Sequence, residues 1–234
     1  MEKTKEEVPE KLRIAVLLSF ISGYINAFTY NNAGELFAGA QTGNVIFMAL
    51  HFAKGNLEKA VEFLIPIISF MIGQIFIYCF RNFFQRRGHK GYIHSSLLML
   101  FIMIMLIVLL PFFDYHFIVV TLAFFAAIQS DTFQRLRGFS YATIMMTGNV
   151  KNAPRLLIEG LVQRDRELLV RGFLLFLIIF SFMLGVGIST YFTQFVKKSA
   201  LVPLILPLSY INYVLFKEEH SVIDVVKSKI RKIK

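Results

Sequence analysis

The chain has 234 residues, of which 56% are hydrophobic and 17% are charged, and its formal net charge is +10. Soluble domains are about 45–50% apolar and about 25% charged, so this composition excludes a water-soluble globular domain. In a soluble protein the net charge would indicate nucleic-acid binding. In a membrane protein the positions of the cations along the chain matter more, because they indicate which segments face the cytoplasm.

Six apolar runs bounded by charged residues predict membrane-spanning helices, because most approach the ~20 residues that a helix needs to cross a bilayer. The run at 115–129 is the shortest and spans the bilayer only if the helix continues through residues 130–134, which would place Asp131 inside or just under the membrane. The six runs are residues 14–30, 61–80, 92–113, 115–129, 172–192 and 199–216.

The distribution of the cations predicts the topology. If the amino terminus is cytoplasmic and each run crosses once, all of the 25 Lys and Arg residues except Lys54, Lys59, Lys197 and Lys198 lie on the cytoplasmic side. The positive-inside rule therefore favours six spans with both termini cytoplasmic. Residues 217–234 form a basic cytoplasmic tail, either as an amphipathic helix on the inner leaflet or as a disordered segment.

An internal repeat divides the chain. Thr-Gly-Asn-Val occurs at residues 42–45 and again at 147–150, and Ser-Phe-Met-Ile-Gly at 69–73 is echoed by Ser-Phe-Met-Leu-Gly at 181–185. A weaker third match aligns residues 23–27 with 127–131. Because the matches occur in the same order, they predict one transmembrane domain of two related halves, about 11–113 and about 114–216.

The segment around the first repeated motif decides whether the second half of the chain is parallel to the first or inverted. Residues 31–41 are rich in glycine and polar groups, and Thr42 is a plausible N-cap for a helix from residue 43 to about 54. Such a helix is roughly 18 Å long, near half a bilayer, so we expect it to enter and return on one side. Each half then keeps three full spans, and the second half is inverted. We therefore predict an all-α membrane protein with six transmembrane helices plus two re-entrant half-helices, as a 3+3 inverted repeat.

The two repeated motifs form the leading candidate site, since half-helix N-termini near the midplane would favour an anionic or carbonyl-bearing ligand. The alternative is structural: Thr caps, Gly packs and Asn bonds a neighbouring backbone. Polar residues of the first helix in each half could line the same space. The predicted substrate-binding residues are Tyr24, Asn26, Thr42, Gly43, Asn44, Gln129, Thr147, Gly148 and Asn149.

Two further features concern charge. Asp131 is the one carboxylate predicted at a span boundary, so it is either a coupling acid or one partner of an interfacial salt bridge with Arg135 or Arg137. The second motif segment is also more polar than the first. It is predicted to border a wet cytoplasmic vestibule, whose cations contact either an anionic substrate or lipid head groups. It carries Lys151, Asn152, Pro154, Arg155 and Glu159 where the first segment has Ile46, Phe47, Ala49, Leu50 and Lys54.

The residues Ala40 to Asn44 and Met146 to Asn149 also carry a family resemblance. Over roughly residues 10–215 the chain resembles the YoaK-type family of small bacterial membrane proteins. The resemblance implies a multi-pass protein of the bacterial plasma membrane and adds little about a substrate.

Taken together, these features predict a secondary transporter or facilitator for a small polar or anionic solute. The alternatives are a non-transporting membrane scaffold or assembly factor, and a channel. No phosphate-binding loop, HExxH motif, nucleophile elbow or metal-ligand cluster occurs, so we expect no enzymatic activity, no catalytic residues, no metal and no cofactor. The expected partners are membrane lipids and a small-molecule solute, with no nucleic acid, and the sequence is compatible with a homo-oligomer.

Overall fold

The computed structural model describes residues 8–217, which are almost entirely helical. The predicted tail lies outside the described residues except for Lys217. A short 3-10 helix η1 (Val8–Glu10) precedes the first long helix, and a two-residue antiparallel ladder is the only strand pairing in the described part of the chain. The elements are α1 (Leu12–Asn32), α2 (Gln41–Ala53), α3 (Leu57–Arg86), α4 (Gly91–Leu109), α5 (Tyr115–Thr132), β1 (Arg135–Leu136), β2 (Phe139–Ser140), α6 (Met146–Gln163), α7 (Arg166–Val196) and the 3-10 helix η2 (Lys197–Leu204), followed by α-helical residues 205–217.

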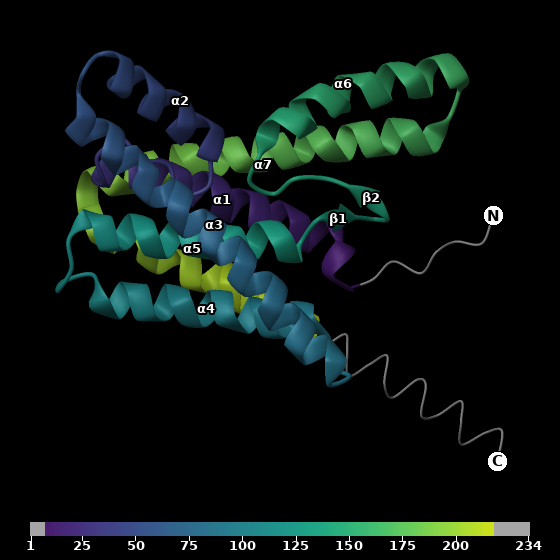
Figure 1. The fold of residues 1–234 in the computed structure, drawn as a ribbon. Helices are drawn as coiled ribbons and strands as arrows, with labels where there is room; N and C mark the ends of the chain where they lie inside the picture. Colours follow the sequence, from purple (N-terminus) through teal and green to yellow (C-terminus); the bar gives the residue numbers. More distant parts are fainter. Residues whose placement is uncertain (1–7, 218–234) are drawn as a thin grey trace.

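Four segments are long and apolar enough to cross a membrane: Leu12–Asn32, Leu57–Arg86, Gly91–Leu109 and Arg166–Lys217. The last has 52 residues and contains α7, η2 and the helix at 205–217. These segments confirm that the chain is an all-α membrane protein. Figure 1 shows that α1, α4 and α7 run in one direction along the long dimension of the molecule, whereas α3, α5 and the helix at 205–217 run in the other.

Burial distinguishes the central helix from the outer ones. In α1, 72% of the most apolar window is buried, against 28–33% in the other three candidate segments. A helix buried in this way packs against protein on most sides, while the others keep apolar faces outward, as lipid contact requires. On α3 the outward apolar residues include Ile68, Met71, Ile72, Ile75 and Tyr78.

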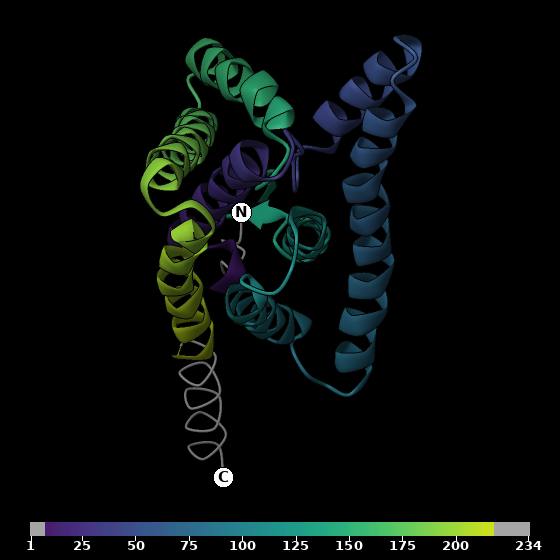
Figure 2. The same cartoon turned by 90° about the vertical axis from the view of Figure 1, so that its left-hand side faces the viewer.

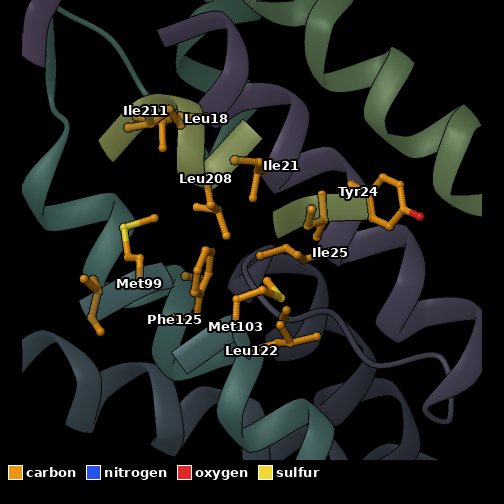
Figure 3. Close-up of a cluster of buried hydrophobic side chains, with 14 of the residues drawn as sticks. Leu18, Ile21, Tyr24, Ile25, Met99, Met103, Leu122, Phe125, Leu208 and Ile211 are labelled. Carbon is orange, nitrogen blue, oxygen red and sulfur yellow. The ribbon is translucent and has the colours of Figure 1, made fainter. Parts of the chain in front are cut away.

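The core lies between α1, α4, α5 and the helix at 205–217. Figure 3 shows its side chains pointing toward one another, with Tyr24 at its edge. This cluster joins the first helix of the chain to the last described one, so the two ends of the chain fold together. Its labelled members include Leu18, Ile21 and Ile25 of α1, Met99 and Met103 of α4, Leu122 and Phe125 of α5, and Leu208 and Ile211.

Helices of one half pack against helices of the other. The long helix α7 lies along α1, and α3 lies along α5. The same side-chain hydrogen bond occurs in both pairs: the Ser69 hydroxyl donates to the Val120 carbonyl at 2.7 Å, and the Ser181 hydroxyl donates to the Val16 carbonyl at 2.7 Å. Residues that the sequence matches between the halves therefore make matching contacts in the structure.

Glycine permits the close approach at both crossings. A Cβ atom at Gly23 would lie 2.0 Å from the Phe182 carbonyl oxygen, and one at Gly185 would lie 2.1 Å from the Phe20 carbonyl oxygen. At the other crossing, a Cβ at Gly73 would lie 2.6 Å from the Cβ of Ala127. Small residues thus let the helix backbones touch, as they do in many membrane helix pairs.

Several predicted boundaries differ from the observed ones. Helix α2 begins at Gln41 with Ala40 as its N-cap, so the prediction of Thr42 as N-cap was wrong. The reason is that the Ala40 carbonyl accepts from the N–H groups of Gly43 and Asn44, which closes the first turn earlier. Helix α5 ends at Thr132 rather than extending through residue 134. Helix α6 has 18 residues, about 27 Å, and is therefore longer than half a bilayer.

Candidate functional site

The asparagine of each repeated motif is buried and binds the backbone seven residues before it. The Asn44 Oδ1 accepts from the Phe37 N–H at 3.0 Å, and the Asn44 Nδ2 donates to the Phe37 carbonyl at 2.8 Å. In the second half, Asn149 makes the same pair of bonds to Ala142, at 3.1 and 2.6 Å. The carboxamide thus satisfies both backbone polar groups of one residue outside the helix, and we call this arrangement the carboxamide clamp. It fixes the start of α2 and of α6 against the segment that leads into each helix.

Asn26 holds the first of these segments against α1. Its Oδ1 accepts from the N–H groups of Gly39 and Ala40 at 2.9 and 3.0 Å, and its Nδ2 donates to the Ser22 carbonyl at 2.8 Å. The Thr29 hydroxyl accepts from the Ala38 N–H at 3.1 Å, next to this contact. The irregular backbone at residues 38–40 is therefore paired with side chains, as buried backbone outside a helix must be.

The two segments that lead into α2 and α6 touch each other. A Cβ atom at Gly39 would lie 2.5 Å from the Ile144 side chain, so the second segment passes directly over the glycine of the first. Figures 1 and 2, which are turned by 90°, both place the first turns of α2 and α6 beside each other near the middle of the molecule. The two helix starts that carry the repeated motifs therefore lie close together.

Within each motif the side chains divide into two groups. Asn44 and Asn149 are buried, whereas Thr42, Thr147 and Gly148 are exposed. Gly43 is half-buried, because the Phe37 ring would lie 2.9 Å from a Cβ at that position. The inward asparagine supports the fold, and the outward threonine is the group that a ligand could reach.

Tyr24 and Gln129 lie in packing between helices. The Tyr24 hydroxyl donates to the Ala200 carbonyl of η2, and the Gln129 Nε2 donates to the Leu18 carbonyl at 3.0 Å and the Ser22 hydroxyl at 2.7 Å. Both side chains are at most 1% exposed. The Gln129 Oε1 has no hydrogen-bond partner among the described residues. These two residues are therefore buried in helix packing, unlike the exposed Thr42 and Thr147.

Asp131 forms an ion pair with Arg81 of α3. The Arg81 Nη1 donates to the Asp131 Oδ2 at 2.6 Å and to the Asp131 carbonyl at 2.7 Å. The predicted structural alternative named Arg135 or Arg137 as the partner, and that assignment was wrong. The chain leaves α5 after Thr132 and enters the β1–β2 hairpin, where the Arg137 N–H donates to the Glu10 carbonyl. Sequence reasoning missed Arg81, because the pair joins segments fifty residues apart.

Two open hollows lie away from the repeated motifs. One, of about 260 Å³, is bounded by β2, α6 and α7 and includes Arg155 and Arg171 in its wall. The other, of about 270 Å³, lies between the end of α4 and η2, beside Lys198. Among residues 8–217, no group of three His, Cys, Asp or Glu side chains is placed to hold a metal ion.

Comparison with known proteins gives the family. The model of the family described as "protein of unknown function (DUF1275)" matches residues 14–213. The chain belongs to the DUF1275 family. No curated protein and no solved structure matches the chain. The matched region begins in α1 and ends in the helix at 205–217, so it contains both repeated motifs, the carboxamide clamps and the ion pair of Asp131.

Proposed function

We propose that this DUF1275 protein is a secondary transporter or facilitator that carries a small polar or anionic solute across the bacterial plasma membrane. The observation that carries the proposal is the meeting of the first turns of α2 and α6, with Thr42 and Thr147 exposed there. The first turn of a helix carries the positive end of the helix dipole, so it favours an anionic or carbonyl-bearing group. Two such turns at one place provide a binding site that two halves of a transporter could share.

The architecture that we propose with this function is six membrane spans in a 3+3 inverted repeat, with α2 and α6 as re-entrant elements. Three observations support it. The chain reverses direction at each long helix (Figure 1), the hydrogen bonds of Ser69 and Ser181 match, and the carboxamide clamps of Asn44 and Asn149 match. Impermeant thiol labelling of Lys54→Cys and His89→Cys tests it, because the two positions should react from opposite sides of the membrane.

The proposed orientation has both termini in the cytoplasm, and the proposed kinship is with the YoaK-type proteins. Support for the orientation comes from the positive-inside rule. In Figure 1 the start of α1 and the end of the helix at 205–217 lie at the same end of the molecule, as an even number of spans requires. The proposed partners are membrane lipids and the solute. We propose no cofactor, no nucleic acid and no enzymatic activity, and a homo-oligomer is compatible with the proposal.

The test of transport is flux. Purified protein in proteoliposomes is assayed for uptake and efflux of a panel of anionic and polar metabolites, with and without a proton gradient. We expect saturable flux of at least one solute, reduced at least tenfold by Thr42→Val combined with Thr147→Val. Valine keeps the shape of threonine, and neither hydroxyl forms a hydrogen bond among the described residues, so the fold is retained.

Folded protein without flux for any solute would contradict transport. If partners then co-purified with the protein through its cytoplasmic segments, the scaffold alternative would replace the transporter. Stepwise single-channel currents in planar bilayers would instead identify a channel. Asp131 is proposed as a coupling acid, so Asp131→Asn should abolish the effect of the proton gradient while flux down a solute gradient persists.

A further inference from the structure

The hollow beside α6 has walls from three elements. It lies on the side of the molecule where Glu10 binds the β1–β2 hairpin. The Glu10 carbonyl accepts a hydrogen bond from the Arg137 N–H, and the Glu10 carboxylate accepts one from the Gly138 N–H. The volume of the hollow, about 260 Å³, is enough for a small anion with bound water. The wall residues are Phe139, Ser140, Asn152, Arg155, Leu156, Glu159, Arg171 and Leu175.

In the first half of the chain, rings fill the corresponding place. The Phe47 ring stacks on Phe37 and Phe63, with centroid distances of 6.4 and 5.5 Å, and His51 stacks on Phe63 at 5.6 Å. In the second half the corresponding positions hold smaller or non-aromatic side chains: Ala142, Asn152, Leu156 and Leu175. The hollow is therefore not a necessary consequence of this helix arrangement, because aromatic rings occupy the corresponding positions in the other half.

Two arginines give the hollow a positive character. The Arg155 Nε donates to Glu159 Oε1 at 2.7 Å, and the Arg171 Nη2 donates to Glu167. The Arg171 guanidinium also lies 5.6 Å from the centre of the Phe139 ring. A guanidinium has five N–H donors, so each arginine keeps donors beyond those that its glutamate uses. The wall contains two cations, Arg155 and Arg171, and one carboxylate, that of Glu159.

The polar wall belongs to one face of α6. Lys151 and Arg155 lie one turn apart on the helix, beside Asn152 and Glu159, while an apolar face contains Val150, Ile158 and Leu161. The first half has Ile46, Phe47 and Leu50 at the positions of Lys151, Asn152 and Arg155. The fold therefore does not require these polar residues, and their chemistry is the kind that recognises an oxyanion.

We propose that this hollow binds an oxyanion, a phosphate or carboxylate group, between the guanidinium groups of Arg155 and Arg171. The same chemistry is carried by a soluble anion and by the head group of an anionic phospholipid. That the transported solute first binds at this site from the cytoplasm is a role that rests on the proposed transport function, whereas oxyanion binding itself does not.

The experiment measures binding rather than flux. Full-length protein in a neutral detergent is titrated with inorganic phosphate and with succinate at constant ionic strength, and the shift of its thermal unfolding gives Kd. A parallel arm adds phosphatidylglycerol or phosphatidylcholine to the micelles and counts bound lipids by native mass spectrometry. Arg171→Gln removes one guanidinium, and Asn152→Phe restores the ring of the first half without removing any cation.

The matched control is Arg87→Gln. Arg87 is another exposed arginine, placed 4.0 Å from the Phe83 ring and outside the hollow. We expect Arg171→Gln and Asn152→Phe each to raise the oxyanion Kd at least tenfold, and Arg87→Gln to change it less than twofold. This pattern with phosphate or succinate identifies a soluble ligand; the same pattern seen only with phosphatidylglycerol identifies a head group, and both support the site.

The proposal is overturned if phosphate, succinate and phosphatidylglycerol all fail to bind, or if folded Asn152→Phe and Arg171→Gln proteins bind as tightly as Arg87→Gln. Equal losses in all three variants would also overturn it, since they would indicate diffuse attraction to surface charge. Absence of flux in proteoliposomes would contradict transport but leave these binding results intact, so the two proposals fail separately.

Discussion

The carboxamide clamp makes a quantitative prediction about stability. Replacing Asn44 by Ala removes two hydrogen bonds to Phe37 and leaves its N–H and carbonyl groups without those partners. A hydrogen bond contributes about 0.5–1.5 kcal/mol net, and a buried polar group left unpaired costs about 1–3 kcal/mol. The expected loss in the free energy of unfolding is therefore about 2–4 kcal/mol, or roughly 30-fold or more in the unfolding equilibrium constant. Because Asn149 makes the same bonds, Asn149→Ala should cost a similar amount.

The assay is reversible unfolding of purified protein in mixed micelles, followed by circular dichroism. Thr42→Ala is the control, since the exposed Thr42 side chain should contribute within about 0.5 kcal/mol. Asn44→Asp sharpens the test: it keeps the acceptor for the Phe37 N–H but places a carboxylate oxygen against the Phe37 carbonyl. We expect it to destabilise at least as much as Asn44→Ala. If all three Asn variants unfold like Thr42→Ala, the clamp does not fix the helix starts and this reasoning is refuted.

Three further predictions concern packing, charge and pH. Gly23→Ala should destabilise by about 1–3 kcal/mol, because the new Cβ meets the backbone of α7, whereas Gly148→Ala meets nothing within 4 Å and should be nearly neutral in the same unfolding assay. The Arg81–Asp131 pair should show a coupling energy of about 1 kcal/mol in a double-mutant cycle of Arg81→Gln and Asp131→Asn, and strictly additive losses would contradict it. The N–H of Phe117 and the His116 side chain hold the pKa of Asp114 below its usual range, so its stabilising contribution is present at neutral pH and lost as the pH falls through that lowered value. The free energy of unfolding, measured as a function of pH, should lose this acid dependence in the Asp114→Asn variant. An unchanged pH profile would contradict the assigned contribution of Asp114.

The sequence predicted the helices well because apolar runs and charged boundaries are local signals. Five of the six runs lie within helical segments, and the run at 92–113 extends four residues past the end of α4 at Leu109. The polar stretch at residues 31–41 is irregular through most of its length. The boundaries were less accurate, since caps depend on distant groups. The helix starts at Gln41 because Ala40 closes the first turn, and Asn26 of another helix binds the segment before it.

The candidate site was predicted in part. Motif repetition placed the two Thr-Gly-Asn-Val segments together, but composition alone gave no sign that Asn44 and Asn149 point inward while Thr42 and Thr147 point outward. The direction of a side chain depends on the segment that each helix start packs against. The partner of Asp131 was missed for the same reason: Arg81 stands next to it only because α3 lies along α5.

The hollow beside α6 was recognised only by combining the sequence with the structure. The sequence indicated that the second motif segment is more polar than the first, and it left the role of that difference open. Only the packing shows that Phe47 stacks with its neighbours where Asn152 opens onto a hollow. The polar residues of the second half indicate a binding site only once the structure shows which contacts the two halves have in common.

The most direct test of the central claim is uptake through a site that can be blocked at the motif. Cys79 is the one cysteine of the chain, so Cys79→Ser gives a background for the single substitution Thr42→Cys. Proteoliposomes are assayed for uptake of the solute that the panel identifies, before and after treatment with a charged, impermeant thiol reagent. We predict that modification stops uptake, that the solute slows modification, and that the Cys79→Ser protein is unaffected. Unchanged uptake after complete modification, verified by mass spectrometry, would contradict a transport path at the meeting of α2 and α6.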